Sequence, residues 1–90
     1  MKYIIRTDRA GVFYAGIESR NGSEAVLTDA RRIHYWQGAT ECIGIALNGV
    51  GAGSRVTASI PKMEVLGVIE VLPVSEEAQE VLDKCPAWTV

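Results

Sequence analysis

The fold of this chain is decided by residues 12–27, VFYAGIESRNGSEAVL, which carry two strand-forming runs joined by a tight turn. Valine, phenylalanine, tyrosine and isoleucine favour extended backbone in the first run, and only Gly16 interrupts it. Asn21 and Gly22 tolerate the positive φ that both central positions of a two-residue hairpin turn require. The stretch therefore predicts a β-hairpin whose returning strand covers residues 24–27.

Further strands are predicted on both sides of this hairpin. Residues 3–6, YIIR, form a short strand closed by the turn-rich residues 8–11, so residues 1–27 predict a three-stranded meander. After a break expected at residues 28–29, residues 30–36 can form another strand. Its alternation would place Arg31, Ile33 and Tyr35 on one face and Arg32, His34 and Trp36 on the other.

The second half of the chain predicts two helices and two strands. Thr40 can cap a short helix over residues 41–47 that ends at Asn48-Gly49 and buries a stripe of Cys42, Ile43, Ala46 and Leu47. A weak strand over residues 55–60 should end at Pro61. The strongest strand pattern covers residues 64–72, which are apolar on both faces and are therefore expected in the centre of the sheet or at a subunit contact. Ser75 then caps a helix that Pro86 closes.

These elements predict an α+β fold in one small domain spanning residues 1–90. It should contain an antiparallel sheet of five to six strands, one short central helix and a C-terminal helix. The two cysteines, Cys42 and Cys85, are far apart and lack ligand spacing, so we expect both to be reduced and buried. No apolar run is long enough to span a membrane, and we expect a cytoplasmic protein. The net charge of −2 makes nucleic acid an unlikely partner.

Residues 29–39, DARRIHYWQGA, concentrate binding chemistry. Arginine offers a planar fork of donors that matches phosphate, and tyrosine and tryptophan offer flat faces for a base. The glycine-rich residues 49–54 can add backbone N–H groups, although their spacing matches no known nucleotide motif. We therefore predict a small anionic nucleotide as ligand, with binding residues Arg31, Arg32, Tyr35, Trp36, Gly51, Gly53, Ser54 and Arg55.

The sequence contains no evident catalytic arrangement. No serine lies in a nucleophile-elbow context, and a single histidine, His34, would have to serve any catalytic triad. His34 also lacks a second histidine or a carboxylate at metal-ligand spacing. We therefore expect a binding protein rather than an enzyme, with no catalytic residue, metal or cofactor.

The run ARRIHYWQGA, residues 30–39, resembles the Ala-Arg-Arg-(Ile/Leu)-Trp-x-Trp-x-Gly-Ala signature of a family of small phage proteins of unknown function. Residues 4–6, 10–13, 70–73 and 86–88 extend the resemblance over nearly the whole chain. The pattern is similar to the Thoeris anti-defence sponges, homo-oligomers that trap cyclic ADP-ribose isomers or cyclic oligonucleotides. The resemblance implies a phage-encoded sponge that sequesters such a signal in the host bacterial cytoplasm as a dimer or larger assembly. His34 departs from the pattern, because it stands where the signature carries a tryptophan.

Two alternatives remain open at this point. A protein-binding module, either an inhibitor or a virion accessory, could use Tyr35, Trp36 and Trp88 as interface anchors. A nucleic-acid binder could stack bases on the strand aromatics, although the acidic balance disfavours it.

Overall fold

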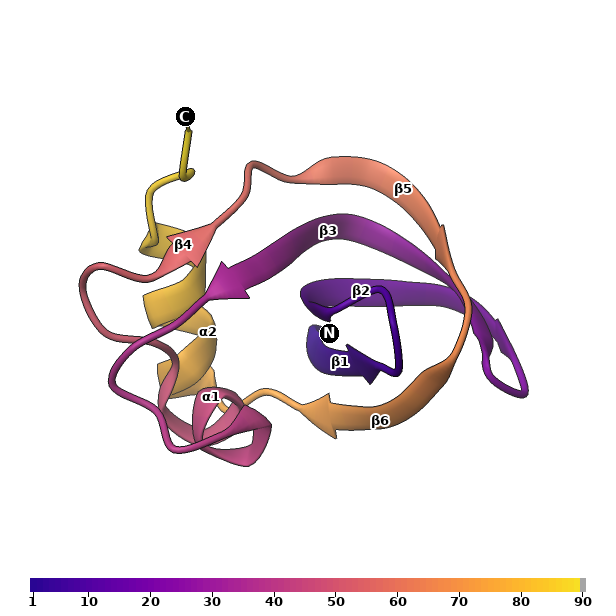
Figure 1. Cartoon of the computed structure of the whole chain (residues 1–90), viewed down its shortest axis with the longest axis horizontal. Helices are drawn as coiled ribbons and strands as arrows, with labels where there is room; N and C mark the ends of the chain where they lie inside the picture. The colour runs from indigo at the N-terminus through magenta and orange to yellow at the C-terminus, as the bar shows by residue number, and fades with distance from the viewer. Residues whose placement is uncertain (90) are drawn as a thin grey trace.

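The computed structural model describes residues 1–89 and contains one six-stranded antiparallel sheet and two helices, which confirms the α+β class (Figure 1). No helix within these residues is long and apolar enough to cross a membrane. The elements follow in the order β1 (Tyr3–Thr7), β2 (Val12–Asn21), β3 (Glu24–Tyr35), α1 (Cys42–Asn48), β4 (Arg55–Val56), β5 (Ile60–Val65), β6 (Val68–Pro73) and α2 (Glu76–Lys84).

The sheet is built around the predicted meander of β1, β2 and β3. Its strand order is β4-β3-β2-β1-β6, and β5 also pairs with β3. β4 and β5 lie one after the other along the edge of β3 that faces away from β2, because β4 pairs near Ile33 and β5 pairs between Ala25 and Ala30. The predicted strand over residues 55–60 is therefore wrong in extent: β4 has two residues, and β5 begins at Ile60 and continues through Pro61.

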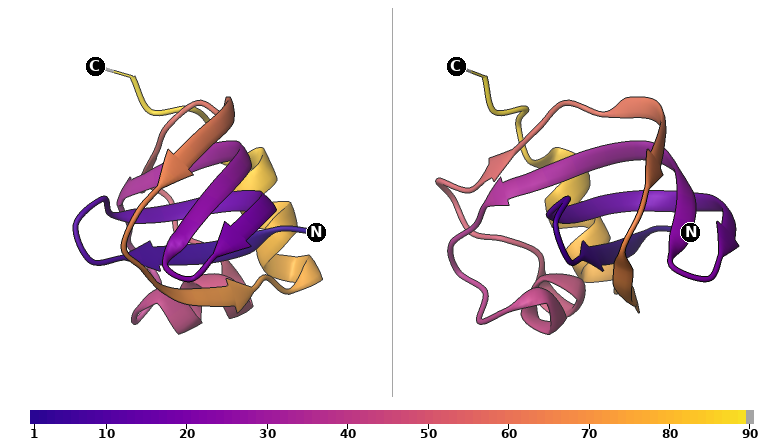
Figure 2. Two further views of the ribbon diagram at one scale, coloured as in Figure 1. Left: turned by 90° about the vertical axis from the view of Figure 1, so that its right-hand side faces the viewer. Right: turned by 45° about the vertical axis from the view of Figure 1, so that its right-hand side comes forward.

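The sheet curls strongly, because β5 and β6 are neighbours in sequence but lie on opposite edges of the sheet. Figure 2 shows the chain wrapping around one end of the molecule as it passes between them. Gly67 makes the sharp turn with a φ of +75°, a conformation that glycine adopts without strain. Its carbonyl accepts from the Asp8 N–H, and the next residue, Val68, donates to Ser23. The prediction of one central strand over residues 64–72 is thus wrong, since a glycine turn divides this stretch into two edge strands.

β3 is one strand of twelve residues, so the predicted break at residues 28–29 is also wrong. Asp29 instead has a φ of +46° inside the strand. The register moves from Gly16 opposite Thr28 to Tyr14 opposite Arg31, so β3 contains one extra residue at this point, which is a β-bulge. Asp29 thus adopts a turn-like backbone conformation as its sequence suggests, but the neighbouring strands on both sides keep β3 continuous.

Two hydrophobic clusters lie on the two faces of the sheet. Successive residues of a strand point to opposite faces, so Ile4 and Tyr14 pack under the helices while their neighbours Ile5 and Phe13 pack inside the curl of the sheet. The helix-side cluster consists of Ile4, Tyr14, Ile33, Cys42, Ile45, Ala46, Val56 and Leu82. The cluster inside the curl consists of Ile5, Phe13, Ala15, Ala25, Leu27, Ala30, Val65 and Val68.

The two helices differ in how well their sequences predict them. The Ser75 hydroxyl accepts from the Ala78 N–H at 3.0 Å, which confirms the predicted cap of α2. The N-cap of α1 is Glu41 rather than Thr40, and it makes no side-chain capping bond. The predicted apolar stripe of α1 is wrong in part, because Ile43 and Leu47 are more than half exposed and Ile45 is fully buried instead. Both cysteines are free, Cys42 buried and Cys85 half-buried.

Candidate functional site

An exposed cluster of aromatic rings and one guanidinium lies where β3, β4 and the C-terminal segment meet. The His34 and Trp88 rings are stacked, with centroids 4.9 Å apart and an angle of 6° between the ring planes. The Arg55 guanidinium lies 5.4 Å from the centroid of Trp88 and 5.8 Å from that of Tyr35, within the range of cation–π attraction. We call these four residues the aromatic cluster.

A second β-bulge positions His34. Ile33 lies opposite Val56 and Tyr35 lies opposite Arg55, so β3 has one extra residue between two adjacent partners on β4. Bulges of this kind redirect side chains. The predicted alternation of faces therefore stops at Ile33, and His34 and Tyr35 join the same cluster instead of lying on opposite faces.

The chain after α2 brings Trp88 to the same place. Ala87 forms a parallel bridge with Val56, and the Trp88 N–H donates to the Val56 carbonyl at 2.7 Å. This segment therefore lies beside β4 and places the Trp88 ring over the Arg55 guanidinium. Proline at position 86 cannot continue a helix, which is the local reason that α2 ends before this return.

Arg55 has no hydrogen-bond or ion-pair partner among the described residues, and its side chain is exposed. The ion pairs found there are Arg6 with Glu70 at 2.9 Å and Lys62 with Glu18 at 3.1 Å. Flat faces beside an uncommitted guanidinium can stack a base and bind a phosphate at the same time.

The glycine-rich loop lies against the end of β3, and several of its polar groups make hydrogen bonds within the fold. The Ser54 hydroxyl accepts from the Gln37 N–H at 3.0 Å and donates to the Gly51 carbonyl at 2.7 Å. The Gly51 N–H donates to the Gln37 carbonyl at 2.7 Å. A Cβ at Gly51 would lie 3.2 Å from that same carbonyl oxygen, so this glycine permits close packing of two chain segments. Gly53, the other glycine predicted to bind, has a φ of +87°.

Arg31 is committed to the fold. Its guanidinium donates to four main-chain carbonyls, those of Thr57 at 2.6 Å, Leu82 at 2.7 Å, Cys85 at 2.8 Å and Val56 at 3.5 Å. Leu82 and Cys85 lie at the C-terminal end of α2, where carbonyls lack partners within the helix and the dipole favours a cation. Arg31 therefore joins β4 and α2 to β3.

The next residue, Arg32, points elsewhere. Its guanidinium lies 5.0 Å from the centroid of the Phe13 ring, over the cluster inside the curl, and makes no hydrogen bond or ion pair within the described chain. Trp36 is half-buried and packs against the helix-side cluster. Of the eight predicted binding residues, Tyr35 and Arg55 belong to the aromatic cluster. The other six lie outside it.

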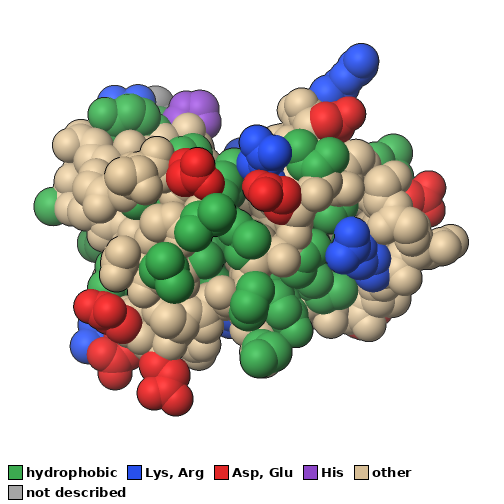
Figure 3. Space-filling view, turned by 90° about the horizontal axis from the view of Figure 1, so that it is seen from below, with side chains coloured by type: hydrophobic (Ala, Val, Ile, Leu, Met, Phe, Trp, Pro, Cys, Tyr) green, Lys and Arg blue, Asp and Glu red, His purple; other side chains and the backbone are tan. Residues whose placement is uncertain are grey.

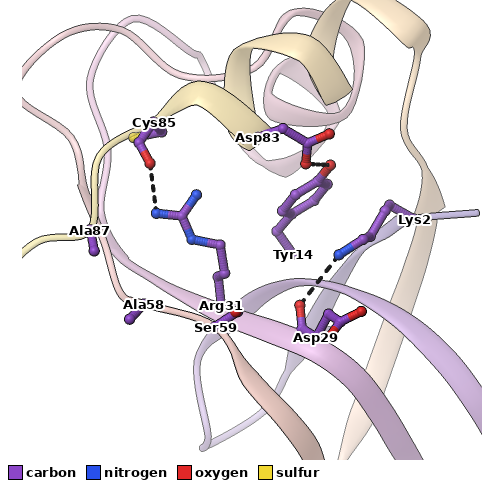
Figure 4. Close-up of a pocket in the computed structure, with 9 residues that line it drawn as sticks. All are labelled: Lys2, Tyr14, Asp29, Arg31, Ala58, Ser59, Asp83, Cys85 and Ala87. Atoms are coloured by element: carbon purple, nitrogen blue, oxygen red, sulfur yellow. Dashed lines mark hydrogen bonds between the residues drawn. The ribbon is translucent and has the colours of Figure 1, made fainter.

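A separate hollow of about 430 Å³ opens between α2, the start of β1 and the middle of β3 (Figure 4). Two cationic side chains, Lys2 and Arg31, and two acidic ones, Asp29 and Asp83, line it. The Tyr14 hydroxyl donates to Asp83 at 2.6 Å, and burial together with this bond raises the Tyr14 pKa above its usual range. Because its charges balance and the Arg31 donors are used, this hollow is a weaker anion site than the aromatic cluster.

Two members of the aromatic cluster were not predicted as ligand residues. His34 was expected to be an ordinary polar residue of the strand, and Trp88 was considered as an anchor for a protein partner. The bulge at His34 depends on the two-residue pairing of β4, and Trp88 reaches the site through a bridge between segments 31 residues apart in sequence. No local signal in the sequence reveals either arrangement.

Comparison with known proteins places the chain in one family. The model of the family described as "Domain of unknown function (DUF6948)" matches residues 1–82, so the chain belongs to this family. No curated protein and no solved structure gives a significant match to the chain. The expectation of an uncharacterised family is confirmed at this level, and the similarity to the Thoeris anti-defence sponges stays a prediction.

Proposed function

We propose that this member of the DUF6948 family binds a small anionic nucleotide on the aromatic cluster and holds it without chemical change. The observation that carries the proposal is the Arg55 guanidinium, which is exposed, has no partner among the described residues, and lies within 6 Å of two ring centroids. A guanidinium without a partner gains most from an anion, and rings beside it favour an anion that carries a flat group.

Different residues of the aromatic cluster suit the phosphate and the base of the ligand. The Arg55 guanidinium supplies forked donors for phosphate oxygens, and the exposed face of Tyr35 supplies a stacking surface. His34 already occupies one face of Trp88, so a base would extend this stack or replace the imidazole. A histidine ring also stacks with bases, so His34 partly replaces the tryptophan that the phage signature carries at this position.

The finer proposal is a phage-encoded immune-evasion sponge. Such a protein would bind a cyclic oligonucleotide or a cyclic ADP-ribose isomer in the host cytoplasm and keep it from its receptor. The proposal rests on the resemblance of residues 30–39 to the phage signature and on a site that offers binding groups for phosphate and base.

A thermal-shift screen tests the proposal. The probes are cyclic di- and trinucleotides, cyclic ADP-ribose isomers and a short single-stranded DNA. A ligand present at a hundred times its Kd stabilises the folded state by about 2.7 kcal/mol, which raises the Tm clearly in a domain of this size. We expect a shift with a cyclic nucleotide or a cyclic ADP-ribose isomer and none with DNA. A screen without any shift would contradict the proposal, and a shift with DNA alone would favour nucleic-acid binding.

Chromatography of the bound ligand separates sequestration from catalysis. After heat denaturation of the complex, a sponge releases its nucleotide unchanged in stoichiometric amount. Product formed in excess of the protein would show turnover and would revive the hypothesis of an enzyme.

Self-association is the second part of the proposal. Ile43 and Leu47 on α1 are 51% and 56% exposed, and Ile69 on β6 is 52% exposed. Figure 3 views the molecule from the side of α1 and β6 and shows hydrophobic side chains gathered between charged ones. We expect sedimentation equilibrium to give a dimer or larger assembly at micromolar concentration, and Leu47→Glu to weaken it. A monomer of 9.7 kDa would contradict this part.

The same exposed residues support the second candidate function, which is binding of a protein partner. An apolar patch with a charged rim is typical of a protein interface. A chain that is monomeric and binds no nucleotide would favour this candidate, and Leu47→Glu should then abolish capture of the partner while Arg55→Met has no effect.

A further inference from the structure

The aromatic cluster depends on a segment of the chain that has few contacts of its own. Trp88 lies beyond α2, and this segment is joined to the sheet by the bridge between Ala87 and Val56 and by the Trp88 N–H bond to Val56. β4, on which Arg55 lies, has only two residues. Both halves of the cluster therefore rest on short pairings, which on the side of β4 are extended by the Thr57 N–H bond to the Arg32 carbonyl and the Arg32 N–H bond to the Thr57 hydroxyl.

Arg31 contacts both of these short segments. On the side of β4, its guanidinium donates to the carbonyls of Thr57 and Val56, at 2.6 and 3.5 Å. On the side of α2, it donates to the carbonyls of Leu82 and Cys85, at 2.7 and 2.8 Å. Figure 4 shows the guanidinium of Arg31 reaching from β3 toward Cys85 at the end of α2.

One carbonyl links Arg31 directly to the cluster. The Val56 oxygen accepts the Trp88 N–H at 2.7 Å and also lies 3.5 Å from Nη2 of Arg31. Cys85, whose carbonyl Arg31 holds, is three residues before Trp88. The guanidinium therefore fixes the start of the C-terminal segment and, through Val56, the residue with which that segment pairs.

We infer that Arg31 is a positioning residue, which holds β4 and the chain after α2 together and so sets the stacking of Trp88 on His34. Arg31 does not contact the ligand in this arrangement. Its effect on nucleotide affinity rests on the proposed function, whereas its effect on the geometry of the cluster does not.

His34 provides a direct probe, because it is the only histidine in the chain and its ring lies parallel to an indole. The ring current of Trp88 moves the imidazole proton signals of His34 upfield, and Trp88→Ala defines their position without stacking. In the ligand-free full chain we expect Arg31→Met to move these signals most of the way to the Trp88→Ala position. Arg31→Lys keeps the charge but cannot reach four carbonyls, so its signals should lie between those of Arg31→Met and wild type.

Arg32→Met is the matched control. It removes the same group from the next residue, whose guanidinium makes no hydrogen bond within the described residues, and it should leave the His34 signals unchanged. Wild-type His34 signals in both folded Arg31 variants would overturn the inference. Loss of the folded spectrum in both would also overturn it, because Arg31 would then be required for the whole fold rather than for the cluster.

Nucleotide titrations separate this inference from the proposed function. For a cyclic nucleotide found in the thermal screen, we expect Arg31→Met and Trp88→Ala each to weaken affinity about tenfold, and the double variant to lose little more than one single variant. Additive losses would mean that Arg31 acts on the ligand by another route, which would contradict the positioning role. If no nucleotide binds, the proposed function fails and the His34 measurement still decides the inference.

Discussion

Arg31 and Arg32 are adjacent residues of the same type on one strand, and they lie in opposite surroundings. The Arg31 guanidinium is half-buried under α2 and donates to four carbonyls. The Arg32 guanidinium lies over the Phe13 ring on the other face and donates to no residue in the described chain. Strand alternation sends the two side chains apart, and the elements packed on each face decide what they do.

Residue type and motif therefore do not reveal whether an arginine holds the fold or is available to a ligand. Both arginines are candidates for phosphate binding because of their chemistry, and strand alternation predicts that only one of them faces the ligand. On one face the carbonyls at the end of α2 accept from Arg31, whereas on the other face the Arg32 guanidinium makes no hydrogen bond or ion pair to a described residue. The guanidinium available in the aromatic cluster belongs to a third arginine, Arg55.

The two faces of β3 should differ most in how much their arginines contribute to stability. Arg31→Met removes a donor from four carbonyls, two of which, those of Thr57 and Cys85, are left without any other among the described residues, and we expect it to lower the free energy of unfolding by about 3 kcal/mol. Urea unfolding followed by circular dichroism measures this change, and Arg32→Met is the control. Equal losses in the two variants would contradict the contrast between the two faces.

The face under α2 should also show a pH effect. The Tyr14 pKa is raised by burial and by the bond to Asp83, so the folded state keeps its proton at a pH where the unfolded state has lost it. The stability that this provides is complete below the usual tyrosine pKa of about 10 and decreases as the pH rises above it.

Tyr14→Phe tests this effect. The variant should lose about 1.5 kcal/mol at neutral pH because the bond to Asp83 is absent. Between roughly pH 9 and 11, its free energy of unfolding should fall less steeply than that of the wild type. Parallel curves in this range would show that Tyr14 titrates alike in the folded and unfolded states.

The meander and α2 could be predicted because their signals are local. The hairpin turn and the cap at Ser75 involve residues close in sequence, although the turn lies one residue later than predicted, at Gly22-Ser23, because Asn21 is the last residue of β2 and pairs with Glu24. The errors arose where the outcome depends on distant partners. Asp29 looks like a turn residue, yet β2 and β5 on either side hold it within β3. Gly67 interrupts an apolar run whose pattern alone indicated a central strand.

The site could be predicted only in part for the same reason. Of the residues predicted to bind a ligand, Tyr35 and Arg55 lie together in the structure, and their role in binding stays a prediction. The stacking of His34 on Trp88 needs a bulge, a two-residue strand and a return of the chain after α2. Each is a tertiary feature that residue spacing does not encode.

Arg55, the third arginine, should affect binding more than folding. Arg55→Met removes the guanidinium of the aromatic cluster, so we expect the affinity for a cyclic nucleotide to fall at least tenfold, which corresponds to about 1.4 kcal/mol. Its urea midpoint should fall only slightly, because the group makes no hydrogen bond within residues 1–89 and its two cation–π contacts are exposed. Calorimetric titration measures the affinity. Full affinity in this variant would exclude the aromatic cluster as the phosphate site.

The smallest effect is expected at Arg32. Its cation–π contact with Phe13 at 5.0 Å is solvent-accessible, and such contacts contribute about 0.5–1 kcal/mol. Arg32→Met keeps most of the aliphatic cover over the ring, so the loss of stability should be near the lower end of this range. Nucleotide affinity should not change, since the guanidinium lies outside the aromatic cluster. A tenfold weaker affinity in Arg32→Met at unchanged stability would return Arg32 to the ligand site and would show that both faces of β3 contribute to binding.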